Sequence, residues 1–168
     1  MPDTFIKIAS VTVGSGGAAS MSFSSIPSTY TDLCVKISGR SSRTGVGYDD
    51  LNFSLNGSTS SFSTRSIQGS GSSVSSFNST NFLGQLDTAA NTSSTFTSVD
   101  FYIPNYAGST NKSFTSDSVQ EDNATTAYSN LVAGLWSNTA AITSITLNPG
   151  VGSFVQYSTA TLYGIKNS

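Results

Sequence analysis

LCVKIS, at residues 33–38, alternates apolar and polar side chains with a period of two. Successive side chains of a β-strand point to opposite faces, so this spacing predicts a strand that turns Leu33, Val35 and Ile37 towards a core. The same alternation recurs in LNFSL at 51–55 and in VDFYI at 99–103. The chain is therefore expected to fold around half-buried strands.

Seven further segments have strand character: 5–13, 19–23, 60–67, 113–119, 131–136, 142–147 and 157–165. Turn clusters rich in Gly, Asn and Ser separate the strands: 14–17, 45–49, 56–58, 69–73, 107–111 and 148–152. The Ser-rich stretch 69–79 is expected to be a long surface loop, and one short helical turn is expected near Asn123–Tyr128. About ten strands without an amphipathic helix predict one all-β domain over residues 1–168, an antiparallel sandwich or barrel.

Composition excludes several chemistries. Of 168 residues, 35 are Ser and 21 are Thr, whereas only 7 are basic and 9 acidic. The chain has no histidine, which excludes a Ser-His-Asp triad and His-ligated zinc. Cys34 is its one cysteine, so an internal disulfide framework is also excluded.

Charge and hydropathy limit the partners. A net charge of −2 without a basic stripe argues against binding to nucleic acid. No apolar run approaches the roughly 18 residues of a membrane span. The start, Met1-Pro2-Asp3, lacks the basic region and apolar core of a secretory signal. We expect neither a nucleic-acid nor a membrane partner.

Two short motifs match enzyme patterns. Gly14, Gly16 and Ala19 fit the dinucleotide pattern G-x-G-x-x-G/A, but the residues that follow continue as a strand where that pattern needs a helix. Ser109 and Lys112 fit S-x-x-K, a match that a chain so rich in Ser produces by chance. Both motifs are interpreted as loop sequence.

The acidic residues are not spaced so that two of them share one site. The closest pairs, Asp49–Asp50 and Glu121–Asp122, are adjacent residues, whose side chains on a strand point to opposite faces. Solvated loop charge is the favoured interpretation. The alternative is a calcium site built from loop oxygens of Asp117, Glu121, Asp122 and Asn123, without EF-hand spacing.

Cys34 and the aromatic residues are the remaining candidates for a functional role. Cys34 lies on the polar phase of its strand and is interpreted as a small buried residue, because no histidine is available as its base. Trp136 and the tyrosines are expected in the core or at a subunit interface, with a sugar-stacking platform as the alternative. The sequence predicts no catalytic residue, no cofactor-binding residue and no metal ligand.

Six segments resemble a group of short structural proteins from tailed-bacteriophage virions: SSIPSTYTDL (24–33), SGRS (38–41), NFSLNG (52–57), YIPNYAGST (102–110), GLWSNTAAITSITL (134–147) and YSTATLYGI (157–165). Together they run through almost the whole chain. The resemblance implies a jelly-roll-like β-sandwich on the particle exterior, usually oligomeric. It implies no catalytic residues, and it leaves head and tail locations open.

The leading expectation is a capsid decoration or cement protein, assembled in the host cytoplasm as a homo-oligomer, with a trimer favoured. It would bind the major capsid protein on the outer head surface, through the N-terminal strand Met1–Val13 or a turn-rich edge. The alternative is a tail-tip or fibre-head module that recognises host-surface polysaccharide. An enzyme such as a depolymerase would need two convergent carboxylates from Asp49, Asp50, Asp87, Asp100, Asp117, Glu121 or Asp122.

Overall fold

A computed structural model describes residues 4–123 and 127–166. These residues form twelve strands: β1 (Phe5–Thr12), β2 (Met21–Phe23), β3 (Asp32–Gly39), β4 (Asp49–Leu55), β5 (Phe62–Gly69), β6 (Val74–Ser79), β7 (Phe82–Leu86), β8 (Thr97–Ile103), β9 (Lys112–Gln120), β10 (Tyr128–Trp136), β11 (Ile145–Pro149) and β12 (Thr159–Ile165). Within these ranges no helix is long and apolar enough to cross a membrane.

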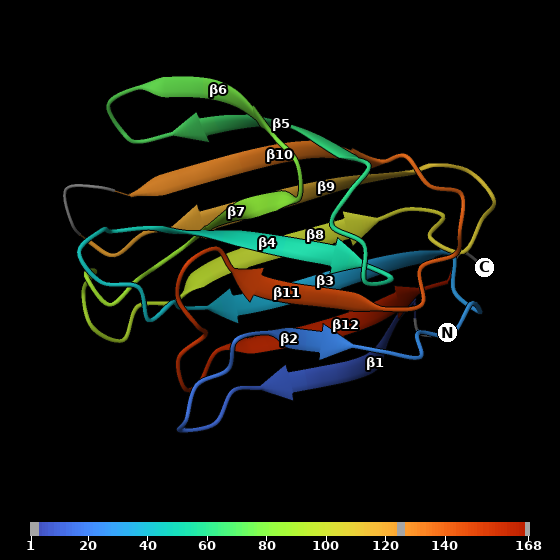
Figure 1. Cartoon of the computed structure of the whole chain (residues 1–168), viewed down its shortest axis with the longest axis horizontal. Coiled ribbons are helices and arrows are strands. Elements are labelled where there is room, and N and C mark those ends of the chain that lie inside the picture. The colour runs from blue at the N-terminus through green and yellow to red at the C-terminus, as the bar shows by residue number, and fades with distance from the viewer. Residues whose placement is uncertain (1–3, 124–126, 167–168) are drawn as a thin grey trace.

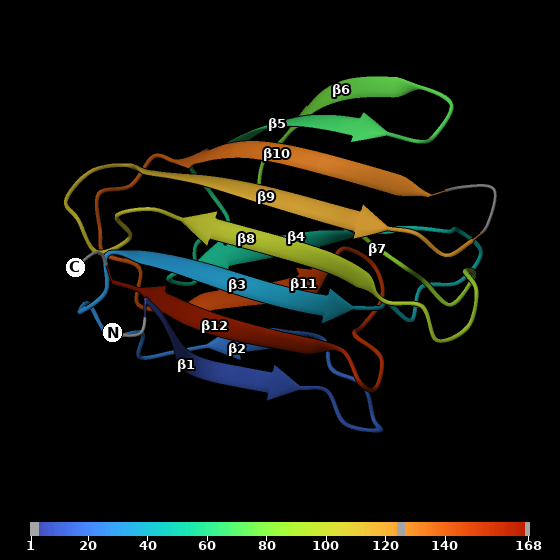
Figure 2. The same ribbon diagram turned by 180° about the vertical axis from the view of Figure 1, so that it is seen from behind.

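The strands form two antiparallel sheets that pack face to face (Figure 1). One sheet has the order β1-β12-β3-β8-β9-β10-β5-β6, and Figure 2 shows it from its outer side. The other sheet has the order β2-β11-β4-β7. The fold is thus a β-sandwich, one of the two architectures that the strand pattern predicted.

The topology is that of a jelly roll with two inserted hairpins. Without β5–β6 and β9–β10, two four-stranded sheets remain, β1-β12-β3-β8 and β2-β11-β4-β7. The chain crosses between these sheets in the order expected of a jelly roll, which confirms the fold that the resemblance implied. The four inserted strands continue the first sheet beyond β8, and we call them the hairpin extension (Figure 2).

The core lies between the two sheets and is closed by aromatic rings. Phe53 on β4 lies 5.0 Å from the ring of Phe62, 5.1 Å from Phe101 and 5.1 Å from Phe114, measured between ring centroids. Phe62 in turn stacks on Trp136 at 5.8 Å. These rings come from both sheets, so they attach the hairpin extension to the jelly roll at one end of its strands.

Ten predicted strand segments are present with shifted ends, but two strands were missed. Residues 69–79 are not a long loop: they contain β6, a mostly polar edge strand that pairs with β5 through its backbone. β7 was not predicted because its residues are all buried and show no alternation. The helical turn expected near Asn123–Tyr128 falls largely outside the described residues, and Tyr128 itself begins β10.

A glycine in β10 permits the close approach of a core ring. A Cβ atom added at Gly134 would lie 2.1 Å from Cζ of Phe114, whereas one added at Gly69 on β5 meets nothing within 4 Å. We predict that Gly134→Ala lowers the free energy of unfolding by about 1–3 kcal/mol, because overpacking displaces the ring. Gly69→Ala is the matched control and should change it little. Urea unfolding followed by Trp136 fluorescence measures both, and equal effects would contradict this packing.

Candidate functional site

The outer face of the hairpin extension carries an exposed apolar patch. Of eight large apolar side chains that are exposed in the described residues, five lie on these four strands. Strand register places all five on the outer face, and we call them the outer patch: Ile67 (55% exposed), Val74 (76%), Val119 (47%), Leu131 (58%) and Leu135 (36%). Monomeric soluble proteins rarely gather exposed apolar side chains in this way.

Ile67 and Leu131 form the centre of the outer patch. They are directly opposite each other on β5 and β10, so their side chains are neighbours. They line a surface hollow of about 430 Å³ together with Arg65 on β5 and Ala133 on β10. The hollow gives the patch a relief into which side chains of a partner could fit.

The same sheet is polar on its outer face where it belongs to the jelly roll. Lys36 on β3 and Asp100 on β8 form an exposed ion pair of 2.6 Å there. Thr161 and Ser38 also lie on this face, beside Lys36 and Ser98 respectively. Among the described residues, the exposed apolar side chains of this face are therefore concentrated on the inserted strands, with Phe5 on β1 as the exception.

Polar side chains lie beneath the outer patch, where a core would normally be apolar. Asn130 on β10 donates to Ser118 Oγ at 3.2 Å, and Gln68 on β5 donates to the amide oxygens of Asn130 and Gln85 at 3.0 and 2.8 Å. Ser116 donates to the Leu83 carbonyl of β7, which lies across β9 and β10. At this end of the extension the usual pattern is inverted, with polar groups inside and apolar groups outside.

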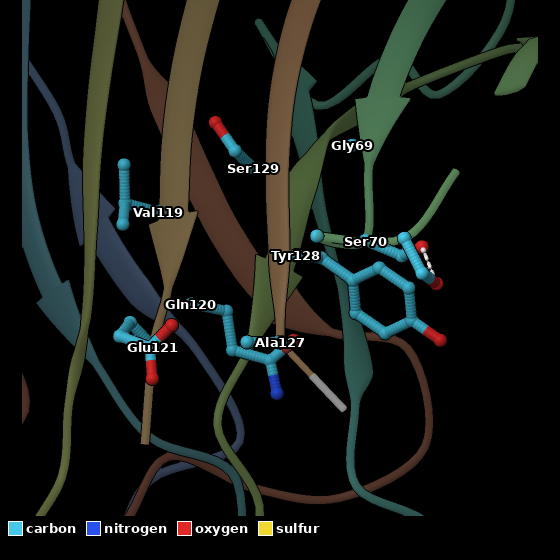
Figure 3. Close-up of a pocket in the computed structure, with 10 residues that line it drawn as sticks. Gly69, Ser70, Val119, Gln120, Glu121, Ala127, Tyr128 and Ser129 are labelled. Atoms are coloured by element: carbon cyan, nitrogen blue, oxygen red, sulfur yellow. Dashed lines mark hydrogen bonds between the residues drawn. The ribbon is translucent and has the colours of Figure 1, made fainter. Parts of the chain in front are cut away.

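A second hollow of about 600 Å³ lies where the β5–β6 and β9–β10 hairpins turn. Figure 3 shows the Tyr128 ring directed towards Ser70, while Gln120 and, farther from the ring, Glu121 lie on the β9 side of the hollow. Tyr128 also packs edge to face on Tyr48 at 5.8 Å between centroids. The ring and the nearby serine hydroxyl groups thus present an apolar face and hydrogen-bonding groups at one surface.

The two motif matches have structural roles. Gly14 and Gly16 lie in the turn after β1, and the next element is strand β2. The helix that a dinucleotide-binding motif needs after its glycines is therefore not formed. Lys112 is buried, and its Nζ donates to carbonyls of Gly108, Thr110 and Thr139. Burial lowers the pKa of this amine, but no bond joins it to Ser109 among the described residues.

The adjacent acidic pairs are divided between structural and solvent-exposed roles. Asp49 is buried and accepts hydrogen bonds from Ser41 Oγ at 2.6 Å and from the Gly152 amide at 2.9 Å, while Asp50 is exposed on the other face. Glu121 is exposed, whereas Asp122 is buried and accepts from Asn91 Nδ2 at 2.6 Å. In each pair the two side chains differ in burial.

The calcium hypothesis gains no support from the arrangement of these residues. Asp117 lies on the outer face of β9, directly opposite Asp100, away from the loop that contains Asp122 and Asn123. No group of three acidic or cysteine side chains suited to a metal occurs within residues 4–123 and 127–166. Asp100 and Asp117 are the acidic residues that the sheet brings together, which adjacency in sequence did not indicate.

Cys34 and Trp136 lie where packing was expected. Cys34 is buried, and burial raises the pKa of its thiol. Trp136 is in the core beside Phe62. Among the tyrosines, Tyr106 is buried, and Tyr102 donates to Asp32 at 2.7 Å, a bond that raises the pKa of Tyr102 to about 12. These aromatic residues do not form one exposed platform.

Asp87 is a buried carboxyl at the end of β7. Neither of its oxygens has a partner in good hydrogen-bond geometry among the described residues, although the side chains of Gln120 and Thr97 lie close enough to act on its charge. Burial raises the pKa of Asp87, and the negative charge of Asp122 raises it further, while Gln120 and Arg40 act in the opposite direction.

This arrangement predicts a pH-dependent stability. Because the pKa of Asp87 is higher in the folded than in the unfolded chain, its contribution to the free energy of unfolding falls as pH rises above about 3.8. Asp87→Asn keeps the shape without the charge. Relative to the unsubstituted chain, the variant should be more stable, with a higher free energy of unfolding, at about pH 7 than at about pH 3. Two parallel curves over this range would contradict the prediction.

Comparisons of the chain with family models, with curated proteins and with solved structures give no match.

Proposed function

We propose that the chain is a structural subunit of a phage virion, a capsid decoration or cement protein that binds the outside of the head. The observation that carries this proposal is the outer patch. The jelly roll is topologically complete without the hairpin extension, yet the extension displays Ile67, Leu131 and their neighbours to solvent. An exposed apolar surface of this kind fits a protein that works by binding other subunits of a particle.

The stabilising effect would come from burial alone. A subunit that binds the assembled shell but not its separated parts raises the free energy needed to separate them. Few charges, 16 of 168 residues, make such binding weakly dependent on ionic strength. The partners are the major capsid protein and further copies of this chain.

The open edge of β1 is the proposed contact with the capsid. β1 ends the eight-stranded sheet, so on one side of its backbone no strand of the described residues pairs with it. Phe5, in this strand, is 54% exposed, although it also contacts Tyr163 edge to face at 6.1 Å. An open edge with an apolar anchor can accept a strand from a partner.

A second candidate function rests on the hollow beside Tyr128. Its ring, Glu121 and the surrounding hydroxyl groups favour a saccharide ligand, as in a tail-tip or fibre-head module that binds host polysaccharide. In that case the chain would act in few copies at the tail, and its contacts would be with the host.

Copy number and sedimentation distinguish these functions. A decoration protein should be present in hundreds of copies per particle, should co-sediment with empty heads, and should raise the temperature at which heads rupture. Heads that lack the protein are the control. A few to dozens of copies located at the tail would support the saccharide-binding function. Unchanged rupture temperature together with no co-sedimentation would contradict the decoration function.

A further inference from the structure

We propose that the outer patch is covered by the same patch of a second copy, related by a two-fold axis that crosses β10. This inference rests on the proposed function, in which copies of the chain associate. It deepens that function by naming the occupant of the patch and the symmetry of the contact.

One acidic residue at the rim of the patch lacks a counter-ion. Asp117 on β9 is directly opposite Asp100 on β8, and like charges in such pairs are unfavourable. Lys36 compensates Asp100 through the 2.6 Å ion pair. Asp117 is exposed and takes part in no ion pair among the described residues.

One basic residue lies on the other side of the patch. Arg65 on β5 is exposed, donates to its neighbouring Thr64 carbonyl at 3.0 Å, and forms no ion pair within the described part of the chain. β10 lies between Arg65 and Asp117, so they are two strand spacings apart, roughly 10 Å across the sheet. Strand register also displaces them by one row along the strands.

A single two-fold axis satisfies both charges. In an isologous contact, residue i meets residue j of the other copy, and j meets i. An axis that lies parallel to the sheet and oblique to β10, and that crosses β10 between Leu131 and Ala133, brings Arg65 of each copy towards Asp117 of the other. The same operation brings Leu131 towards Ile67, so the two most central apolar side chains also cover each other. The patch is thus complementary to itself in charge and in hydrophobicity.

The area is sufficient for a specific contact. Four strands at about 4.8 Å spacing, each about 25 Å long, present roughly 500 Å² of sheet per copy. Two copies would bury about 1,000 Å², which is near the lower limit for a specific interface. Arg65 and Asp117, at opposite sides of the apolar centre, then determine the register between the copies.

Charge exchange tests the pairing on the full chain. Arg65→Asp and Asp117→Arg should each weaken dimerisation at least about tenfold, or about 1.4 kcal/mol, in sedimentation velocity. The double variant, which restores opposite charges across the axis, should recover most of the affinity. Lys7→Asp makes the same charge change on the outer face of β1, outside the patch, and should leave the dimer unaffected.

Other outcomes would overturn the two-fold contact. These are a monomeric unsubstituted chain, a trimer as the sole species, or a double variant no better than the single ones. Leu131→Ser provides a second measurement that does not depend on charge: it should weaken the dimer while far-ultraviolet circular dichroism stays unchanged. If the dimer is absent but the chain still co-sediments with heads, only this inference fails. If the dimer forms but heads are not bound, the proposed function fails instead.

Discussion

The packing of aromatic rings around Phe53 is the interaction on which the rest of the structure depends. Phe53 contacts Phe62, Phe101 and Phe114, and Phe62 continues the cluster to Trp136. These rings join the small sheet to the jelly-roll strand β8 and to three strands of the hairpin extension. Because the cluster is at one end of those strands, their other end is free to carry polar groups inside and apolar groups outside.

Because of the inverted pattern, the exposed apolar side chains lie on a surface that a partner can bury. Complete burial of a large aliphatic side chain contributes about 1.5–3 kcal/mol of stabilisation. Ile67 and Leu131 are more than half exposed, so much of this stabilisation is gained only when a partner covers them. The polar layer below, held by Gln68, Asn130 and Ser118, keeps the strands in register without using these apolar side chains. In the proposed association, folding and assembly thus use separate surfaces of the same sheet.

Sequence patterns predicted the strands whose residues alternate, such as 33–38, because one side of each faces an apolar core. They missed β6 because an edge strand is held by backbone pairing to β5, and β7 because it is buried on both faces. The outer patch could not be predicted either. Ile67 and Leu131 are distant in sequence, and an apolar residue in a strand is normally assigned to the core. Only the order of the strands shows that this face is open.

Chemical labelling shows directly whether the outer patch is covered by a second copy, because the native Cys34 is buried. Leu131→Cys and, as a control on the outer face of the jelly roll, Ser98→Cys would be treated with a maleimide at concentrations where the chain is associated and where it is dilute. If a second copy covers the patch, the thiol at position 131 is protected on association, while the thiol at position 98 reacts at the same rate throughout. Equal reactivity of both positions in the assembled state would contradict it.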